Sequence, residues 1–487
     1  LGVLLDSFHT LSLKGDPRAI AEIPVDKIIF VQMADNEADN DPQTSEGVFV
    51  YTGNAPTGYV AGDRVRLKAK VTEYQGLTEL TTVADHKLCV AGQALPSAAV
   101  VTLPVNSSDD FEPFEGMRVR FSQDLVVNEV YNLGRYGEIS LGSSRHFIGT
   151  QVAAPGADAL AVTAANLKDS ILLDDGLTAQ NPDPVIFPAP GLSASNTVRV
   201  GDKATSLTGV MHYGFNLYRI MPTEPVNFVA ENPRPQSPVL AEGGNLKVAS
   251  FNVLNFFNDV VGGDTNPSGG NRGALTEEEM LLQRAKIVSA ITAMNADIVG
   301  LMEIANNGFG EKSAIKNLVD ALNEKQTAEN AYSYIEIVDE DKYDGKYFGS
   351  DAITVGMLYR AGKVSLAGAA RTIDTPEQHA SAGSVTRIKE GKTETNPGND
   401  AYQRHSLAQT FKIHNENLTV VVNHLKSKGS GCLEDWVNFE ESVDPADQQG
   451  KCNAFRVSAA KVIGEALKDV KGDLLVIGDM NAYGMED

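Results

Sequence analysis

The sequence predicts two structural classes in one chain, an all-β region over roughly the first half and a layered α/β domain after residue 245. Short segments of the first half, such as Asp63–Tyr74, alternate apolar and polar side chains with the period of two that is typical of half-buried strands. After residue 245, apolar segments rich in β-branched residues alternate with segments of helical periodicity. Residues 229–245 contain three prolines and two glycines without periodicity, which indicates a linker.

The first half divides into two predicted β domains. In residues 1–105, the predicted strands at Gly47–Tyr51 and Asp63–Tyr74 are short and closely spaced, which favours a small barrel or sandwich. Residues 106–228 have the same character and form the second β domain. Within it, the alanine-rich stretch Val152–Ala165 is weakly patterned, and we expect a loop there.

The predicted α/β domain covers residues 246–487. Thr276, followed three positions later by Glu279, forms a capping box in front of a helical pattern and so marks the start of a helix. Strands are predicted at 246–257, 296–304, 353–360, 407–413, 418–425 and 473–481, and helices at 276–294, 313–324 and 456–467. Because some predicted strands also follow one another directly, the pattern favours a mixed α/β layered architecture.

The composition is that of a globular protein with a strong acidic excess, at 42% hydrophobic residues, 22% charged residues and a net charge of −23. No stretch approaches the roughly 18 consecutive apolar residues of a membrane span, so we expect none. The acidity argues against a nucleic-acid binder, which must neutralise phosphates, unless a bound metal ion supplies positive charge locally. We expect weak non-specific affinity for DNA and a basic rim at the cleft. The sequence begins at Leu1 without a recognisable signal peptide, and we expect a processed or trimmed N-terminus.

Two of the three cysteines, Cys432 and Cys452, flank the acidic segment Leu433–Lys451. A disulfide between them would close a loop of about 20 residues and stabilise the fold by about 3 kcal/mol in the chain-entropy model. Two unrelated buried thiols are the alternative. The disulfide is favoured and would place the protein in an oxidising compartment. Cys89 lies in a strand-like run, and we expect a buried free thiol there.

Polar side chains stand at the C-terminal ends of four predicted strands, where layered α/β folds bind ligands. They are Asn252, Glu303, His424 and the pair Asp479 and Asn481. Glu303 and Asp479 are hard oxygen ligands suited to Mg²⁺ or Mn²⁺, which can polarise a phosphoryl oxygen. The asparagines can donate to phosphate oxygens, and His424 can donate or move a proton. Each residue alone has an ordinary explanation as a loop cap or turn residue, but four such strand ends in one domain are much less expected by chance.

Five segments, SFNVLNFF, ADIVGLMEI, DAITVGMLYR, VVVNHLKSKG and LLVIGDMNAY, resemble in this order the signature of the endonuclease/exonuclease/phosphatase superfamily. The RGA at Arg272 and the cysteine-bounded loop resemble bacterial extracellular nucleases of the ExeM type. SEGVFVYTG and FEPFEGMRVRF are similar to the OB-like region that precedes the nuclease domain in those proteins. The resemblance implies an α/β fold, a four-layered α/β/β/α sandwich that is incomplete at its C-terminus, preceded by an all-β OB-like small-barrel region.

The resemblance also implies a catalytic set, which comprises Asn252, Glu303, His424, Asp479, Asn481 and Asp351. Of these, Glu303, Asn252 and Asp479 would hold Mg²⁺ or Mn²⁺. Ca²⁺ is an additional candidate ion without assigned ligands. Asp351 would hold His424 in one tautomer, as carboxylates often do for histidines.

Two arginines, Arg404 and Arg272, match phosphate-contacting positions of the same families. The alternative for Arg404 is an ordinary surface salt bridge. On the β-hairpin that includes Asp63–Tyr74, basic residues recur at every second position, which fits either contact with DNA or a solvated strand face.

The sequence departs from the family pattern at its end. In the family, the Asp-x-Asn motif is followed by a further Asp and then by Ser-Asp-His, whereas this sequence stops at Asp487, six residues after Asn481. The Asp–His general base and the last metal carboxylate have no counterpart here. We therefore expect that residues 1–487 alone cut plasmid DNA only at background rates.

The function that these observations predict is a secreted, metal-dependent endonuclease that hydrolyses extracellular DNA, with RNA as a second substrate. We expect a monomer in an extracellular or periplasmic location. The alternative enzyme is a phosphodiesterase or phosphatase that uses the same fold on lipid or nucleotide substrates. The non-enzyme alternative is an OB-based adhesion or scaffold protein with a degenerate hydrolase domain.

Overall fold

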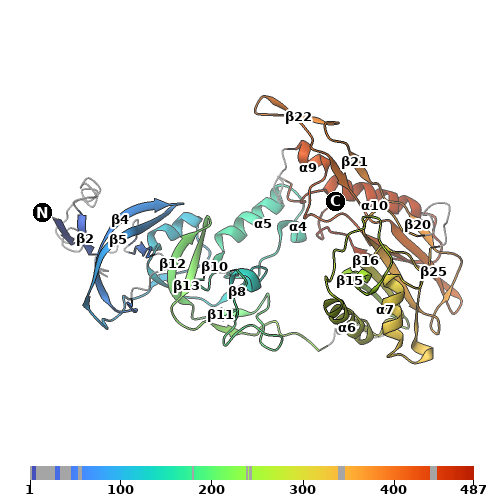
Figure 1. Ribbon diagram of the computed structural model, residues 1–487, viewed down its shortest axis with the longest axis horizontal. Helices are drawn as coiled ribbons and strands as arrows, with labels where there is room; N and C mark the ends of the chain where they lie inside the picture. Colours follow the sequence, from blue (N-terminus) through green and yellow to red (C-terminus); the bar gives the residue numbers. More distant parts are fainter. Residues whose placement is uncertain are drawn as a thin grey trace. The chain divides into compact units, whose positions relative to one another are not determined.

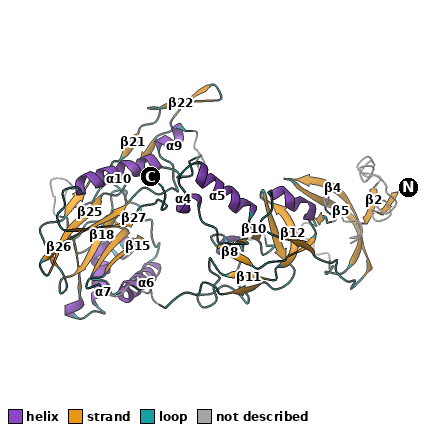
Figure 2. Cartoon of the chain, turned by 180° about the vertical axis from the view of Figure 1, so that it is seen from behind, coloured by secondary structure: helices purple, strands orange, loops and turns teal. Residues whose placement is uncertain are grey.

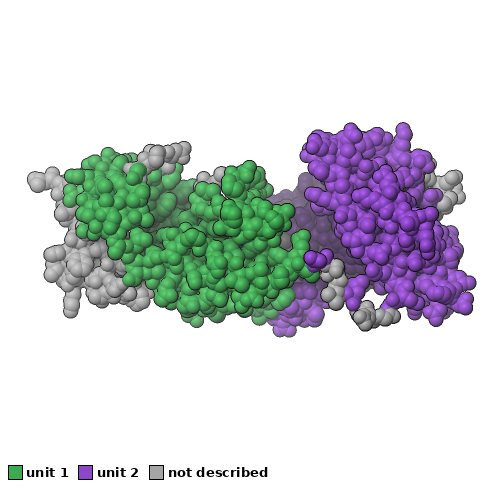
Figure 3. Space-filling view, turned by 90° about the horizontal axis from the view of Figure 1, so that it is seen from below, with its two compact units in different colours: residues 1–148, 161–235 green, residues 149–160, 236–487 purple. Residues whose placement is uncertain are grey.

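The protein is described by a computed structural model, drawn as a ribbon in Figure 1, in which two compact units are distinguished (Figure 3). Unit 1 comprises residues 1–148 and 161–235, and unit 2 comprises residues 149–160 and 236–487. The structure describes residues 3–6, 28–32, 45, 47–52, 58–177, 180–236, 240, 244–337, 346–438 and 447–486. The described helices contain none that is long and apolar enough to cross a membrane.

Unit 1 is built on a nine-stranded sheet in the order β14-β11-β8-β9-β10-β13-β12-β7-β6. Its strands are β6 (Ala99–Val101), β7 (Arg118–Phe121), β8 (Leu125–Glu129), β9 (Ile139–Gly142), β10 (Ile171–Leu173), β11 (Lys203–Thr205), β12 (Thr208–Gly214), β13 (Leu217–Pro222) and β14 (Asn227–Val229). Their alternating apolar side chains form one buried core. Because β6 pairs with β7, this sheet continues across residue 105, where the sequence predicts a domain boundary.

Two smaller sheets complete the described part of unit 1. In the three-stranded sheet, β5 (Leu77–Val90) pairs in parallel with β3 (Phe49–Val50) and antiparallel with β4 (Arg64–Tyr74). In the two-stranded sheet, β1 (Val3–Asp6) pairs in parallel with β2 (Ile28–Gln32). The unit also contains η2 (Ser108–Phe114) and α3 (Leu133–Tyr136). The predicted β-rich character is therefore observed, whereas OB-like topology remains a prediction.

Two sequence predictions in this half of the chain are wrong. The stretch expected to be a loop at Val152–Ala165 is largely helical, with α4 at Gly149–Val152 and α5 at Ala157–Lys168. Alanine has the highest intrinsic helix propensity, so an alanine-rich stretch can form a helix without a strong apolar stripe. Cys89 is a free cysteine as expected, but it is exposed, because it lies in the outer half of β5, whose residues are open to solvent.

Unit 2 is mixed α/β, as predicted, and contains two main sheets (Figure 2). In the first, the order β15-β16-β18-β17 joins β15 (Val248–Phe256), β16 (Ile298–Ala305), β18 (Ile353–Arg360) and β17 (Tyr332–Tyr334). In the second, the order β19-β25-β26-β27 joins β19 (Ser365–Leu366), β25 (Ser406–Ile413), β26 (Glu416–His424) and β27 (Asp473–Asp479), and β20 (Arg371–Ile373) also pairs with β25. The pairs β15–β16 and β26–β27 are parallel.

Three cores show how these elements pack. Helices α6 (Glu277–Met294) and α7 (Ala314–Asn323) cover the first sheet, and α10 (Asn453–Leu467) covers the second. A third core lies between the two sheets and takes buried side chains from both. A Cβ atom at Gly300 would lie 2.7 Å from Ile477 Cδ1 and 2.8 Å from Val422 Cγ2, so the glycine permits the close approach of the sheets.

The helix boundaries of unit 2 follow from local chemistry. The predicted capping box at Thr276 and Glu279 is present and starts α6, which ends at Asn295 in the left-handed conformation. Ser313 caps α7 by accepting from Lys316 N. The remaining described elements are η3 (Asp259–Val261), η4 (Ala328–Asn330), α9 (Leu433–Val437) and two hairpin-like pairs, β21 (Gln378–Ala380) with β24 (Asn399–Ala401) and β22 (Thr386–Lys389) with β23 (Lys392–Thr395).

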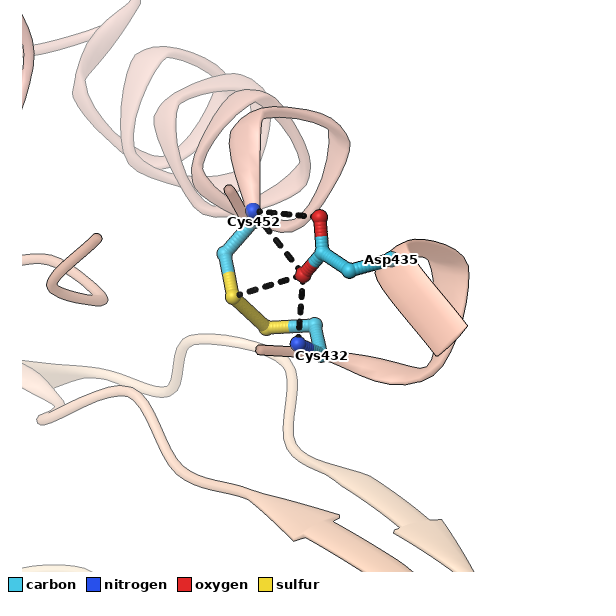
Figure 4. A group of neighbouring side chains, drawn as sticks. All are labelled: Cys432, Asp435 and Cys452. Carbon is cyan, nitrogen blue, oxygen red and sulfur yellow. Dashed lines mark hydrogen bonds between the residues drawn. A yellow bond between two sulfur atoms is a disulfide. The ribbon is translucent and has the colours of Figure 1, made fainter. Parts of the chain in front are cut away.

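The predicted disulfide between Cys432 and Cys452 is confirmed (Figure 4). The carboxylate of Asp435 accepts from the backbone N of Cys432 at 2.5 Å and from that of Cys452 at 3.2 Å, and so ties the start of α9 to the start of α10. The two sulfurs and this carboxylate lie within 4.8 Å of one another. Because the sulfurs are joined, they offer no thiolate to a metal ion, and the group acts as a covalent and polar staple.

Candidate active site

Irregularities in the first sheet position Glu303. Its register against β18 shifts between Met302 and Ile304, and Glu303 lies at this bulge with φ 64°. A non-glycine residue in the left-handed region costs of order 1–3 kcal/mol and persists only where its surroundings fix it. Here the fixing contacts are hydrogen bonds to both carboxylate oxygens, from Asn255 N at 3.0 Å and from Asn252 Nδ2 at 3.0 Å. The bulge thus aims the carboxylate at the end of β15.

Asp479 reaches the same point from the second sheet. It ends β27 opposite His424 of the parallel strand β26. Its Oδ2 accepts from Asn252 Nδ2 at 3.4 Å, and its Oδ1 accepts from Asn481 N at 3.0 Å. Two carboxylates from different sheets therefore converge on one amide nitrogen.

Asn252 acts in this arrangement as a donor. Its side-chain oxygen accepts from Leu254 N at 2.9 Å, which fixes the amide so that the nitrogen faces Glu303 and Asp479. The structure thus brings the three predicted metal ligands together. The role of Asn252 as a ligand stays a prediction, whereas the two carboxylates have the donor chemistry that Mg²⁺ or Mn²⁺ prefers.

His424 lies beside this carboxylate pair and is buried, with 3% of the residue exposed. Its Nε2 is 3.9 Å from Glu303 Oε1, and its buried Nδ1 has no hydrogen-bond partner among the described residues. Burial, reinforced by the charge of Arg404, lowers the pKa of His424 to about 2. The imidazole is therefore neutral at neutral pH, with its Nε2 on the side of Glu303.

Asp351 lies between the two predicted phosphate-binding arginines. Its Oδ1 is 2.9 Å from Arg272 Nη2, and its Oδ2 is 3.5 Å from Arg404 Nη1. The prediction that Asp351 orients His424 is wrong for the described structure, because its two oxygens face the arginines and no hydrogen bond joins it to the imidazole. Sequence position alone could not distinguish these partners, since all four side chains come from different segments.

The two arginines, Arg404 and Arg272, differ in their exposure to solvent. Arg404 is buried, which excludes the alternative of an ordinary surface salt bridge, and its side chain is only 7% exposed, against 47% for Arg272. Burial lowers the pKa of Arg404, and the nearby carboxylates of Asp351, Glu303 and Asp479 oppose that shift. Arg404 is thus fixed within the cluster, while Arg272 presents a charge to solvent.

Two groups of the site were missed in the sequence. The carbonyl oxygen of Leu425 accepts from Arg404 Nη2 at 3.1 Å and from Asn481 Nδ2 at 3.0 Å, and so links these two predicted residues. Lys426 is buried and donates to Ser430 Oγ at 2.6 Å, and burial, followed by the charge of Arg404, lowers its pKa. Both residues lie in the NHLKSKG segment, but the role of a backbone carbonyl leaves no signal in residue identity.

Comparisons with known proteins return partial matches. The model of a Domain of unknown function (DUF8508) matches residues 92–231, which is less than half of the chain. A 35-residue stretch is 83% identical to 3-dehydroshikimate dehydratase of Pseudomonas putida (strain KT2440) and 74% identical to that of Pseudomonas aeruginosa (strain PAO1). This stretch is 7% of the chain, and the chain spans 6% of the length of either relative.

Solved structures similar to this chain include members of the endonuclease/exonuclease/phosphatase family. One is a family protein from Bacteroides thetaiotaomicron, with 17% identity, 48% of this chain and 63% of that chain covered, and a TM-score of 0.27. Humanized D. rerio TDP2 is 15% identical, with 50% of this chain and 68% of that chain covered and a TM-score of 0.27. The human Nocturnin catalytic domain is 16% identical, with 50% of this chain and 66% of that chain covered and a TM-score of 0.27.

Proposed function

We propose that this protein is a divalent-metal-dependent phosphodiesterase of the endonuclease/exonuclease/phosphatase superfamily whose substrate is DNA, with RNA as a second substrate. The observation that carries the proposal is the convergence of Glu303 and Asp479, from two different sheets, on Asn252 next to a neutral buried histidine and two arginines. These groups are far apart in the sequence, and their meeting at strand ends provides metal-binding and phosphate-binding chemistry in one place.

The charge balance of the site favours an anionic substrate together with a metal ion. Among the residues predicted from the sequence, the carboxylates of Glu303, Asp479 and Asp351 give −3 and the guanidinium groups of Arg404 and Arg272 give +2, so the sum is −1 while His424 is neutral. A divalent ion raises this sum to +1, which complements the single negative charge of a phosphodiester. Glu303 and Asp479 would hold the ion, which supplies Lewis-acid polarisation of a phosphoryl oxygen.

The other side chains supply binding and orientation. Arg404, fixed by Asp351 and Leu425 O, presents a preorganised positive charge to a phosphate, and the exposed Arg272 adds an adjustable one. His424 stays neutral and offers a hydrogen bond to a phosphate oxygen without adding charge. Asn481, held by its own bonds to Asp479 and Leu425, keeps the end of β27 in place.

The proposal extends to architecture and location. The packing of helices, sheet, sheet and helix in unit 2 supports the four-layered superfamily sandwich, and the strand-rich unit 1 supports an OB-like region of the kind that precedes ExeM-type nucleases. The buried disulfide supports an oxidising location, extracellular or periplasmic. We propose that the secreted protein acts as a monomer on extracellular DNA.

Binding of Mn²⁺ and of a phosphodiester tests the proposal without a measurement of hydrolysis. By calorimetry, Glu303→Gln and Asp479→Asn should each weaken Mn²⁺ binding by at least about tenfold. Glu416→Gln, at the exposed far end of β26, is the matched control and should bind as the unmodified protein does. Equal binding by all four proteins would refute the metal site.

Substrate class is tested in parallel. With Mn²⁺ present, the protein should bind a short DNA duplex and should not bind sphingomyelin vesicles. The binding of DNA should be lost in Glu303→Gln. Preference for the vesicles, or for a small chromogenic phosphodiester over DNA, would instead favour the lipid or nucleotide phosphodiesterase.

A further inference from the structure

We propose that one face of the β4–β5 hairpin of unit 1 binds the phosphate backbone of single-stranded nucleic acid. The surface is a basic row formed by Arg64, Arg66, Lys68 and Lys70 of β4, together with Lys87 of β5. This would be a second binding surface, on a different compact unit from the candidate active site. It requires no hydrolysis and can therefore be tested apart from the proposed function.

The geometry of β4 turns the sequence alternation into a line of charge. Side chains of a strand point alternately to opposite faces, and those on one face recur about every 6.8 Å in an antiparallel pair. The four cations of β4 are all exposed, while the intervening Val65, Leu67 and Ala69 are half-buried. The row therefore extends over about 20 Å, too long to converge on one compact anion and suited to a linear polyanion.

The neighbouring strand reinforces the positive charge. Lys87 lies directly opposite Arg66 in the register, and Asp85 lies opposite Lys68. Like charges placed directly opposite each other are unfavourable in an isolated sheet. From Arg64 to Tyr74 the face thus carries five cations and two carboxylates, Asp85 and the buried Glu79 opposite Thr72, a local sum of +3, in a chain whose net charge is −23. An acidic protein gains solubility from its carboxylates, so solubility does not account for a basic row.

An aromatic side chain favours nucleic acid over other polyanions. Tyr74 lies on the same alternation as the four cations of β4, at the hairpin end, and is 58% exposed. Binding sites for single strands combine cations that follow the backbone with aromatic rings on which bases stack. A polyanionic peptide or an anionic membrane uses the cations but has no base to stack on the ring.

The test uses the full chain with Glu303→Gln and EDTA, so that the candidate active site contributes no metal-dependent binding. Affinity for a fluorescent oligothymidine is measured by anisotropy across a range of salt concentrations. For single strands, log K falls with log salt by about 0.7 per phosphate contact, so four contacts predict a slope near −3. Replacement of Arg64, Arg66, Lys68 and Lys70 by Gln should reduce the affinity at least about tenfold at low salt and leave a slope no steeper than about −0.7, because only Lys87 of the row remains.

The matched control removes the same charge elsewhere in unit 1, by replacing the exposed, scattered cations Arg120, Arg135, Lys168 and Arg234 with Gln. It should keep most of the affinity and the slope. A second control exchanges Arg for Lys and Lys for Arg along the row, which keeps the charge and should keep binding even if the Gln variant is misfolded. Equal losses in the row and scattered variants, or no binding by the starting protein, would overturn the proposal.

The aromatic ring of Tyr74 allows a separate test of base stacking. Tyr74→Ala should weaken oligothymidine binding severalfold while leaving the salt slope unchanged, because stacking releases no counterions. Polyglutamate of equal charge should compete poorly. Full competition by polyglutamate, with no effect of Tyr74→Ala, would overturn the assignment to nucleic acid in favour of an acidic-peptide surface.

Discussion

Arginine and carboxylate side chains form a three-membered cluster in each unit, and the two clusters differ in what they leave exposed. In unit 1, Arg219 lies between Glu138 and Asp174, with Nη1 2.9 Å and 2.5 Å from their oxygens. All three side chains are at most 15% exposed. In unit 2, the proportion is reversed, since one carboxylate, Asp351, lies between two arginines, and the side chain of Arg272 is 47% exposed.

The difference separates a structural cluster from one that can receive a ligand. Arg219 is buried, pairs with two carboxylates and donates to Gly214 O at 2.8 Å, so this cluster offers no net positive charge outward. In unit 2, one carboxylate cannot neutralise two guanidinium groups, and the surplus charge is adjacent to Glu303, Asp479 and a buried histidine nitrogen without a partner among the described residues. Removing the buried arginine should therefore affect stability in unit 1, and removing the exposed Arg272 should affect binding in unit 2.

The largest expected effect is on the cluster of Arg219, Glu138 and Asp174 in unit 1, which we call the closed cluster. Arg219→Met leaves the buried carboxylate of Asp174 and the partly buried one of Glu138 without their cation, and we expect unit 1 to lose about 3–5 kcal/mol of stability. Hydrogen exchange of unit 1 peptides measures this loss. Lys203→Met, which breaks the exposed pair with Glu231, is the control and should cost less than about 1 kcal/mol. A cost for Arg219→Met as small as that of the control would remove the distinction between the clusters.

The next effect concerns the carboxylate of Asp351, which with Arg272 and Arg404 forms what we call the open cluster of unit 2. Asp351→Asn keeps the shape but leaves buried Arg404 with weaker compensation, and we expect unit 2 to lose about 2 kcal/mol, because Arg404 keeps its bond to Leu425 O. Denaturant unfolding of the purified variant measures the change. If stability rose instead, repulsion of Asp351 by Glu303 and Asp479 would have to outweigh its attraction to the two arginines.

Arg272→Gln should separate binding from stability. Because its side chain is half exposed, its ion pair contributes little to folding, and stability should change by less than about 0.5 kcal/mol. Binding of a DNA duplex in the presence of Mn²⁺ should weaken about tenfold, the loss of one charge-assisted contact to phosphate. Arg371→Gln, at an exposed position of β20 in the same unit, is the control for net charge. Unchanged DNA affinity would mean that Arg272 makes no contact with the phosphates of the bound DNA.

These clusters also show how far the sequence could predict the structure. Apolar strands that end in polar residues are visible in the sequence, and the structure brings Asn252, Glu303, His424, Asp479 and Asn481 close together. The partners of Asp351 were not visible, because three segments with no common periodicity meet there. The bulge at Glu303 was also not visible, since a strand pattern does not show where one residue leaves the ladder. The helix α5 was missed because its alanines carry propensity but little pattern.

The smallest expected effect is a pH dependence next to the closed cluster. Burial, followed by the positive charge of Arg219, lowers the pKa of His212 below its ordinary value of 6.5, against a smaller opposing contribution from Asp174. Between the lowered pKa and 6.5, the unfolded chain binds a proton that the folded chain does not. Stability therefore rises with pH across this window and is lost as the pH falls below 6.5.

Denaturant unfolding of unit 1, followed by hydrogen exchange at about pH 7.5 and about pH 5.5, tests this dependence. Unit 1 should be less stable at the lower pH, and His212→Gln should reduce the difference. Arg219→Met should also reduce it, because the cation that disfavours a protonated His212 is then absent and the pKa returns toward its ordinary value. A difference that persists in both variants would mean that other groups of unit 1 dominate its titration, and that the closed cluster does not transmit its charge to His212.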